Sequence, residues 1–365
     1  MSQNTHASRR SVLQLLGISL GASIAGCVGE VPIGGSDDLL GDVPEASGVG
    51  YLRVEDLLTD SGIQKLGDAY FGQLAENSYY EGPEDYEEAI DEFRDQIDLD
   101  PDTVTDLFAF GDYDQPQQTT PEYAAAIVSA EFDIEDLIDA FENQGTELEE
   151  DDYKGTVVYK SESENALYVG ALSATKYAIG TEEAVESVID VTEGDEESLS
   201  GDVHAAFTAL RSGFIRVAGM VPAEQIPDEY EEFANVNAIS GALYRDEDLL
   251  GGQVALSADD ENDAEDIESA ISDLRSNIRD ETGSQTARDE LSKVELSRDG
   301  ATVVITYERT INELVDIIES NGDTSTFAMA LANDADGELL PSATVPIRAF
   351  RHQIAKFRQV PLISR

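Results

Sequence analysis

The excess of acidic side chains is the feature that most limits what this chain can fold into. The 365 residues include 77 Asp and Glu but only 22 Lys and Arg, so the formal net charge is −55. At low ionic strength, repulsion among so many like charges opposes every compact state. Molar salt shortens the Debye length to about 3 Å and screens most of that repulsion. The composition therefore predicts a protein whose surface is solvated for brine.

The same acidity limits the classes of fold and partner. Hydrophobic residues make up 41% of the chain and recur periodically, which favours a folded body over a disordered acidic chain. A strongly negative surface repels phosphates, so we expect no nucleic-acid partner. The acid runs Glu149–Asp152 and Glu193–Glu197 are predicted to be solvated faces and loops.

The N-terminal segment has the organisation of an export signal. Arg9 and Arg10 precede an apolar run from Val12 to Ile24, and small residues then lead to Cys27. A charged region, a short apolar region and small residues before a cleavage point are typical of a signal peptide. The apolar run is about half of the roughly 20 residues that a spanning helix needs. The alternative is an ordinary N-terminal membrane anchor, but Cys27 is the single cysteine of the chain, which indicates a dedicated role.

This segment resembles the signals of haloarchaeal lipoproteins that are exported by the twin-arginine route and whose function is unknown. Arg9-Arg10 matches the twin-arginine pair, and Ile24-Ala25-Gly26-Cys27 matches the lipobox. The resemblance is confined to the first 27 residues. It implies passage through the twin-arginine translocase, cleavage before Cys27 and a lipid on the Cys27 sulfur that holds the protein at the extracytoplasmic face of the cell membrane. One acyl chain anchors a protein only marginally, so a second contact is expected.

Changes in composition divide the chain into five segments. Residues 1–26 are predicted to form the twin-arginine signal peptide, and residues 27–47 the lipidated cysteine and a flexible tether rich in Gly, Pro, Ser and Asp. Two folded units are predicted over 48–200 and 201–322. The remaining residues, 323–365, form a C-terminal segment that ends in a basic tail.

The first predicted unit contains an unusually regular block. A strand over 123–132 leads to a helix that Asp133 caps, with Asp136 at the position of a capping box. Three strands follow between residues 156 and 180, and Thr181 then caps another helix. Each of these helices carries apolar residues at helical spacing, so each is expected to pack one face against a sheet.

The second predicted unit repeats this order. A hairpin over 238–257 leads to a helix around Ile267, and two strands joined across Arg298-Asp299-Gly300 lead to a helix that Thr310 caps. The predicted fold class is therefore α+β, with mainly antiparallel sheets, helices packed on one face and two similar units. The alternative is that this repeated order of strands and helices arises by chance, as it can in any α+β chain.

No catalytic constellation stands out along the chain. His204 lies on a predicted helix and is expected to be a surface or half-buried residue there. Gly251-Gly252 lies within a predicted strand and lacks the Lys-Ser/Thr that follows the glycines of a phosphate-binding loop. We predict no catalytic residue and no cofactor, although the many acids leave an acid-driven hydrolase as a remote alternative.

One acidic motif partly matches the ligand pattern of a calcium-binding loop. Asp98, Asp100 and Asp102 occupy the first three ligand positions. The sixth position is Thr103 rather than Gly and the twelfth is Ala109 rather than Glu, so the motif departs from the calcium-loop pattern. An Asp-rich turn is predicted instead, and no metal site is expected.

The last 25 residues, from Pro341 to Arg365, contain no acid. Ile347, Phe350, Ile354 and Phe357 recur at helical spacing, and the bases between and beside them are Arg348, Arg351, Lys356 and Arg358. This pattern predicts a basic amphipathic helix suited to an anionic lipid surface or an acidic protein. The alternative is a replaced C-terminus without a selected role.

Together these features predict a lipid-anchored extracytoplasmic module of a halophile that binds a protein or small molecule, or organises the cell envelope, without catalysis. A solute-binding lipoprotein of a transport system is the alternative. Such proteins are built from βα units with parallel strands, whereas hairpins dominate the pattern here.

Overall fold

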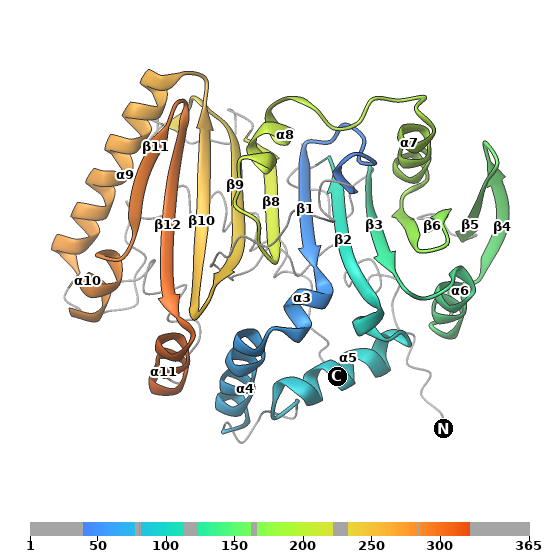
Figure 1. Cartoon of the computed structure of the whole chain (residues 1–365), viewed down its shortest axis with the longest axis horizontal. Helices are drawn as coiled ribbons and strands as arrows, with labels where there is room; N and C mark the ends of the chain where they lie inside the picture. The colour runs from blue at the N-terminus through green and yellow to red at the C-terminus, as the bar shows by residue number, and fades with distance from the viewer. Residues whose placement is uncertain are drawn as a thin grey trace. The chain divides into compact units, whose positions relative to one another are not determined.

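The computed structural model describes residues 39–76, 80, 82–112, 123–161, 166–221, 233–282 and 285–321 (Figure 1). Two compact units divide this part of the chain, and the main boundary lies between Gly201 and Asp202. Each unit combines helices with an antiparallel sheet, so the predicted α+β class is confirmed. That the two units resemble one another stays a prediction.

The first unit is built on a seven-stranded antiparallel sheet. Its strands follow the order β1-β2-β3-β7-β6-β5-β4. The strands are β1 (Gly48–Arg53), β2 (Val104–Gly111), β3 (Ala124–Ala130), β4 (Leu148–Tyr153), β5 (Thr156–Ser161), β6 (Tyr168–Ser173) and β7 (Lys176–Gly180). Its helices are α3 (Val54–Thr59), α4 (Ser61–Ala75, of which residues up to Phe71 belong to this unit), α5 (Tyr86–Ile97), the short 3-10 helix η2 (Pro101–Thr103), α6 (Ile134–Asn143) and α7 (Glu182–Glu193).

Small and β-branched residues let β3 lie at the centre of this sheet. Its sequence, AAAIVSA, is buried at most positions, which suits a strand that has both neighbours paired and a helix on one face. Leu137 and Phe141 of α6 pack into the same apolar cluster as Val128. The rings of Phe132 and Tyr177 stack beside it, with centroids 5.7 Å apart.

The second unit has a five-stranded antiparallel sheet. Its strands follow the order β11-β12-β10-β9-β8. They are β8 (Ile215–Met220), β9 (Val236–Asp246), β10 (Leu249–Ala258), β11 (Glu295–Asp299) and β12 (Thr302–Thr310). The helices are α8 (Gly201–Thr208), α9 (Glu261–Glu281), α10 (Gln285–Leu291) and α11 (Ile311–Asn321). Ala264 and Ile267 of α9 pack against Leu256 and Val303 of the sheet.

The predicted helix caps can be compared with the structure one by one. The Asp133 N–H donates to Asp136 Oδ2 at 3.2 Å, as expected of a capping box. Thr310 and Glu313 form the corresponding reciprocal bonds at the start of α11. Thr181 does occupy the N-cap position of α7, but its side chain makes no cap bond. Its hydroxyl lies 3.4 Å from the carbonyl oxygen of Ala124, so it joins the helix to β3 instead.

Two segments differ from the sequence interpretation. The acid run Glu149–Asp152, predicted to be a solvated face or loop, forms most of β4, although its four side chains are exposed as expected. Residues 39–47, assigned above to the flexible tether, pack into the first unit. Leu39, Leu40 and Val43 are buried, and the Leu199 N–H donates to the Val43 carbonyl at 2.7 Å. These three apolar residues outweigh the Gly, Pro and Asp around them.

The helices within the described ranges were compared with the requirements of a bilayer. None of them combines the length and the apolar character needed to cross a membrane.

Gly251 of β10 lies where a side chain would meet the backbone of β12. A Cβ there would lie 2.5 Å from the Tyr307 carbonyl oxygen and 2.8 Å from Glu308 Cα. We expect Gly251→Ala to lower the free energy of unfolding by about 1–3 kcal/mol, because backbone must move to admit the methyl group. Gly241→Ala, on the adjacent β9, is the matched control, since its Cβ would meet its nearest atoms at 3.5 and 3.6 Å. Denaturant unfolding in constant molar KCl measures both, and equal effects would contradict this reading.

Candidate functional site

The structure explains the residues that the sequence offered as candidate catalytic or phosphate-binding groups. His204 is half-buried on α8, as expected. Gly251 and Gly252 lie inside β10, opposite Glu308 and Tyr307 of β12, where the close approach of two strands explains the first glycine. A phosphate-binding role is not needed to explain either of them.

The acidic motif at residues 98–102 forms a turn organised by an arginine. Asp98 ends α5 in the left-handed conformation, with φ of 56°, and Asp100 begins η2. Arg94 donates from Nε to Asp100 at 3.1 Å and approaches Asp102 at 3.5 Å. The guanidinium therefore occupies the position among the carboxylates that a cation would need. Over all the described residues, no group of three or more His, Cys, Asp or Glu side chains is placed to hold a metal ion.

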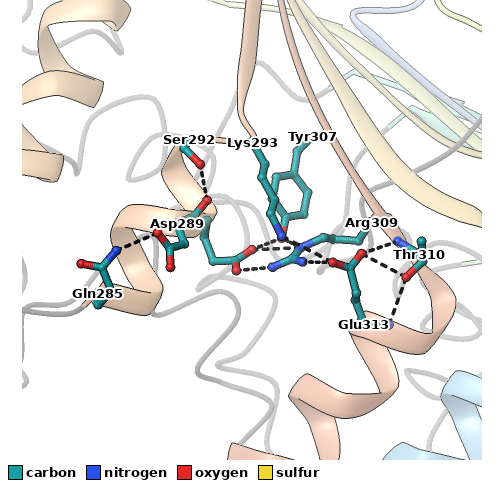
Figure 2. Close-up of polar contacts among 9 residues, drawn as sticks. Gln285, Asp289, Ser292, Lys293, Tyr307, Arg309, Thr310 and Glu313 are labelled. Carbon is teal, nitrogen blue, oxygen red and sulfur yellow. Dashed lines mark hydrogen bonds and ion pairs between the residues drawn. The ribbon is translucent and has the colours of Figure 1, made fainter.

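The residues predicted to direct export and membrane contact lie outside the described part of the chain. These are Arg9, Arg10, Ile24, Ala25, Gly26, Cys27, Arg348, Arg351, Lys356 and Arg358. The candidate site within the described part is instead a polar cluster where β12 runs into α11 (Figure 2).

Arg309, the penultimate residue of β12, is the centre of this cluster. Its side chain is only 6% exposed. Its Nε donates to Glu290 Oε2 at 3.0 Å, and its Nη2 binds Glu290 Oε1 of the same carboxylate. Its Nη1 donates to Glu313 Oε1 at 2.7 Å. One guanidinium therefore binds carboxylates from α10 and α11 at the end of β12, as Figure 2 shows.

Tyr307 and Lys293 complete the cluster. The Tyr307 hydroxyl donates to Glu290 Oε2 at 2.7 Å and accepts from Arg309 Nε at 3.1 Å. Lys293 Nζ lies 3.6 Å from Glu313 Oε1. Both oxygens of Glu290 and both oxygens of Glu313 thus have partners, because Glu313 Oε2 also accepts from the Thr310 N–H at 3.1 Å.

Burial and these bonds fix the protonation states. Burial raises the pKa of Tyr307, and its bond to Glu290 raises it further, so the phenol stays protonated and donates. Burial opposes the charged form of Arg309, but the hydrogen bonds to Glu290 and Tyr307 outweigh burial and raise its pKa. The backbone N–H of Thr310 lowers the pKa of Glu313. A general acid or base needs a pKa near the working pH, and these shifts move the three groups away from it. The cluster is therefore built to join elements rather than to transfer protons.

The sequence carried only part of the signal for this cluster. Arg309 and Glu313 are four residues apart across a predicted strand-to-helix junction, which is a recognisable pairing distance. Glu290 lies on α10, a seven-residue helix that the hydrophobic pattern did not predict. Its pairing with Arg309 depends on the packing of α10, which no local pattern records.

Comparison with known proteins gives no family assignment. No family model matches the chain, and no curated protein matches it. Two solved structures, crystal forms III and IV of TP0453, superpose over 77% of this chain and 97% and 96% of their own. Their sequence identities are 12% and 11%, and their TM-scores are 0.42 and 0.39. These likenesses are too distant to support a conclusion about fold or function.

Arg309→Met tests whether the cluster holds α10 in place. The substitution leaves Glu290 poorly solvated without its cation, and losing one partner of a buried pair costs about 3–5 kcal/mol. Arg94→Met is the control, because its side chain is 35% exposed and exposed ion pairs contribute about 0–1 kcal/mol. Urea unfolding in molar KCl compares them. A joint Arg309→Met, Glu290→Leu variant should recover much of the loss, and failure of this rescue would argue against an uncompensated carboxylate as the cause.

Glu313 makes one part of the stability depend on acid pH. Its pKa is lowered in the folded chain, so its contribution is present above the unfolded pKa of about 4.3. The contribution is lost as pH falls through the lower folded value. We expect the melting temperature of Glu313→Gln to fall less steeply than that of the parent between about pH 5 and 3. Glu319→Gln, an exposed position on the same helix, should keep the parent's slope, and parallel curves for all three proteins would refute the assignment.

Proposed function

We propose that this protein is a lipid-anchored extracytoplasmic module that binds a partner or organises the cell envelope without catalysing a reaction. The observation that carries the proposal is the order of the N-terminal motifs. Arg9-Arg10, a short apolar run and the single cysteine Cys27 after Ile24-Ala25-Gly26 follow one another at the spacing of an exported lipoprotein.

The packing of residues 39–47 supports a close attachment. Asp42 forms an ion pair with Lys176 at 2.6 Å, and Val43 is fully buried. Only residues 28–38 then remain between the lipidated Cys27 and the folded body. A flexible chain of that length has a root-mean-square span of about 18 Å. A body on so short a tether works next to the lipid surface, as a binding or organising module requires.

The polar cluster around Arg309 supports the absence of catalysis. Among the ion pairs of the described residues it contains the most buried cation, yet its groups bind one another. Its ion pairs join helices α10 and α11 to strand β12. The alternative, a solute-binding lipoprotein, is less well supported because the strand pairs within both units are antiparallel rather than parallel.

The anchor is tested by three versions of the chain expressed in a salt-loving archaeal host. The parent should sediment with membranes, and its mass should include a lipid on Cys27. Cys27→Ser should be exported but found in the soluble fraction, because the thiol that accepts the lipid is gone. The double variant Arg9→Lys, Arg10→Lys should stay in the cytoplasm with its signal attached. A Cys27→Ser chain that still sediments with membranes at unchanged yield would refute the lipid anchor.

The type of module is tested with the exported, lipid-free Cys27→Ser chain. Thermal unfolding in molar KCl is followed with sugars, peptides, amino acids and metal ions added in turn. A ligand that binds the folded state raises the melting temperature by mass action, by about 2.7 kcal/mol at a hundredfold excess over its Kd. A saturable shift with one small solute would favour the transport alternative over the proposal. Turnover of any substrate would exclude a non-catalytic module.

A further inference from the structure

Helices α4 and α5 expose an apolar surface that the rest of the first unit leaves incompletely covered. Gly62 is the only buried residue of α4, and α5 has none. Helix α7 of the same unit buries five of its twelve residues. The apolar side chains of α4 and α5 are only half-buried, and Tyr70 is 36% exposed. Helices with apolar faces gain most of their stability from packing, so this surface has room for a further contact.

The two helices are held against one another at a defined point. The Tyr86 N–H donates to Asp68 Oδ1 at 3.1 Å. The Tyr86 ring lies so close to Gly67 that a Cβ there would be 2.4 Å from Tyr86 Cδ2. The surface therefore belongs to two helices that contact one another.

Aromatic rings and carboxylates gather at one place on this pair, which we call the Tyr70 patch. It consists of Tyr70, Phe71, Tyr80, Glu88 and Glu92. The rings of Tyr70 and Phe71 meet edge to face, with centroids 5.3 Å apart. Tyr80, in the connection between α4 and α5, is half-buried; burial, and then the nearby Tyr70, Glu92 and Glu88, raise the pKa of its phenol. Both glutamates are exposed.

The charge of α4 sets it apart from the rest of the protein. Lys65 and Asp68 are its only charged residues, so its net charge is zero. Each of the other α-helices in the described ranges carries a net negative charge, and α5 beside it carries five acids and one base. The patch is thus a neutral aromatic surface with an acidic rim. Its complement is a segment that presents apolar side chains together with bases.

Outside the predicted signal peptide and the described residues, one segment of the chain has that chemistry. Residues 347–358 place Ile347, Phe350, Ile354 and Phe357 at helical spacing, with Arg348, Arg351, Lys356 and Arg358 around them and no acid. Some 25 residues separate Ile347 from Asn321, the last described residue of α11. A flexible chain of that length spans about 25–30 Å on average and about 85 Å when fully extended. The segment can therefore reach surfaces far from the end of α11.

We propose that residues 347–358 dock as a basic amphipathic helix on the Tyr70 patch of the same chain. The apolar side chains cover the half-buried rings, and the bases lie against Glu88 and Glu92. Guanidinium groups also stack on tyrosine faces. Tethering raises the effective concentration of such a segment to the millimolar range. Weak contacts therefore suffice, and apolar burial persists in molar salt that screens longer-range attraction.

Disulfide trapping in the full-length Cys27→Ser chain tests the proposal, because that chain has no other cysteine. Ala75→Cys places a thiol beside the patch, at an exposed position one helical turn after Phe71. Gln353→Cys places the second thiol at the edge of the apolar face of the tail. Oxidation of this pair in molar KCl should be at least tenfold faster than that of the matched pair Val157→Cys, Gln353→Cys. Val157 is 41% exposed on β5, so access alone does not separate the two pairs.

Two further variants of the trapping pair separate a specific contact from random collision. Tyr70→Ala removes part of the patch, and Arg351→Glu with Arg358→Glu reverses two charges of the tail without touching the folded body. Each should slow oxidation several-fold, while circular dichroism shows that the fold is unchanged. Equal rates for the patch and control pairs would overturn the proposal. Equal rates together with binding of the parent to vesicles of anionic phospholipid, lost in Arg351→Glu, Arg358→Glu, would assign the tail to the membrane instead.

Discussion

Several basic side chains in the described part of this protein each bind two or more carboxylates, in a chain where acids outnumber bases by 77 to 22. Arg298 of β11 binds two glutamates of α9, at 3.0 and 3.5 Å. Lys154, in the turn between β4 and β5, binds Asp190 of α7 at 2.7 Å and Asp195 at 2.9 Å. Arg309 joins α10 and α11 to β12. In each case one cation links elements that are far apart in the chain, so the few bases act as cross-links between strands and helices.

These cross-links matter most where apolar burial is smallest. The sheets are held by continuous apolar clusters that include α6 in the first unit and α9 in the second. Helix α10 has a much smaller contact, in which Ile278 and Leu291 are buried beside Leu274. Two or three apolar side chains cannot fix the direction of a seven-residue helix. The bond between Glu290 and Arg309 supplies that direction, and the phenol of Tyr307 holds the carboxylate from a second side.

The elements that the sequence predicted well are those whose pattern is local. The strand around Val128, the hairpin of β9 and β10 and the capped start of α11 each follow from hydrophobic period or cap chemistry within a few residues. The short strand β4 was missed because its side chains are nearly all acidic, and its pairing with β5 depends on backbone bonds that leave no period in the sequence. Helix α10 and the buried residues Leu39 and Val43 were missed for a related reason. Their contacts lie with partners remote in the chain, and their neighbours in sequence are polar.

The candidate site likewise has one part that local sequence predicts and one part that depends on packing. The cap at Thr310 and its Glu313 were visible in the sequence, whereas the partnership of Arg309 with Glu290 required the packing of α10. At the acid-rich turn, the aspartates have calcium spacing but the sequence departs from the calcium-loop pattern at Thr103 and Ala109, and the structure places Arg94 beside Asp100 and Asp102. In a chain with this charge, an acidic cluster indicates a metal site only after each nearby base has been placed.

Concentrated salt acts differently on the two kinds of electrostatic interaction in this molecule. At about 1 M the Debye length is about 3 Å, so repulsion between carboxylates on neighbouring helices is largely screened. The cross-linking pairs are in contact, and the pair of Arg309 with Glu290 is largely withdrawn from water, where screening is weaker. Salt therefore removes the repulsion that opposes folding while it spares the contacts that position the peripheral helices. The position of the bases does not change the net charge, so placing them in contact pairs adds local attraction while brine screens the repulsion that remains.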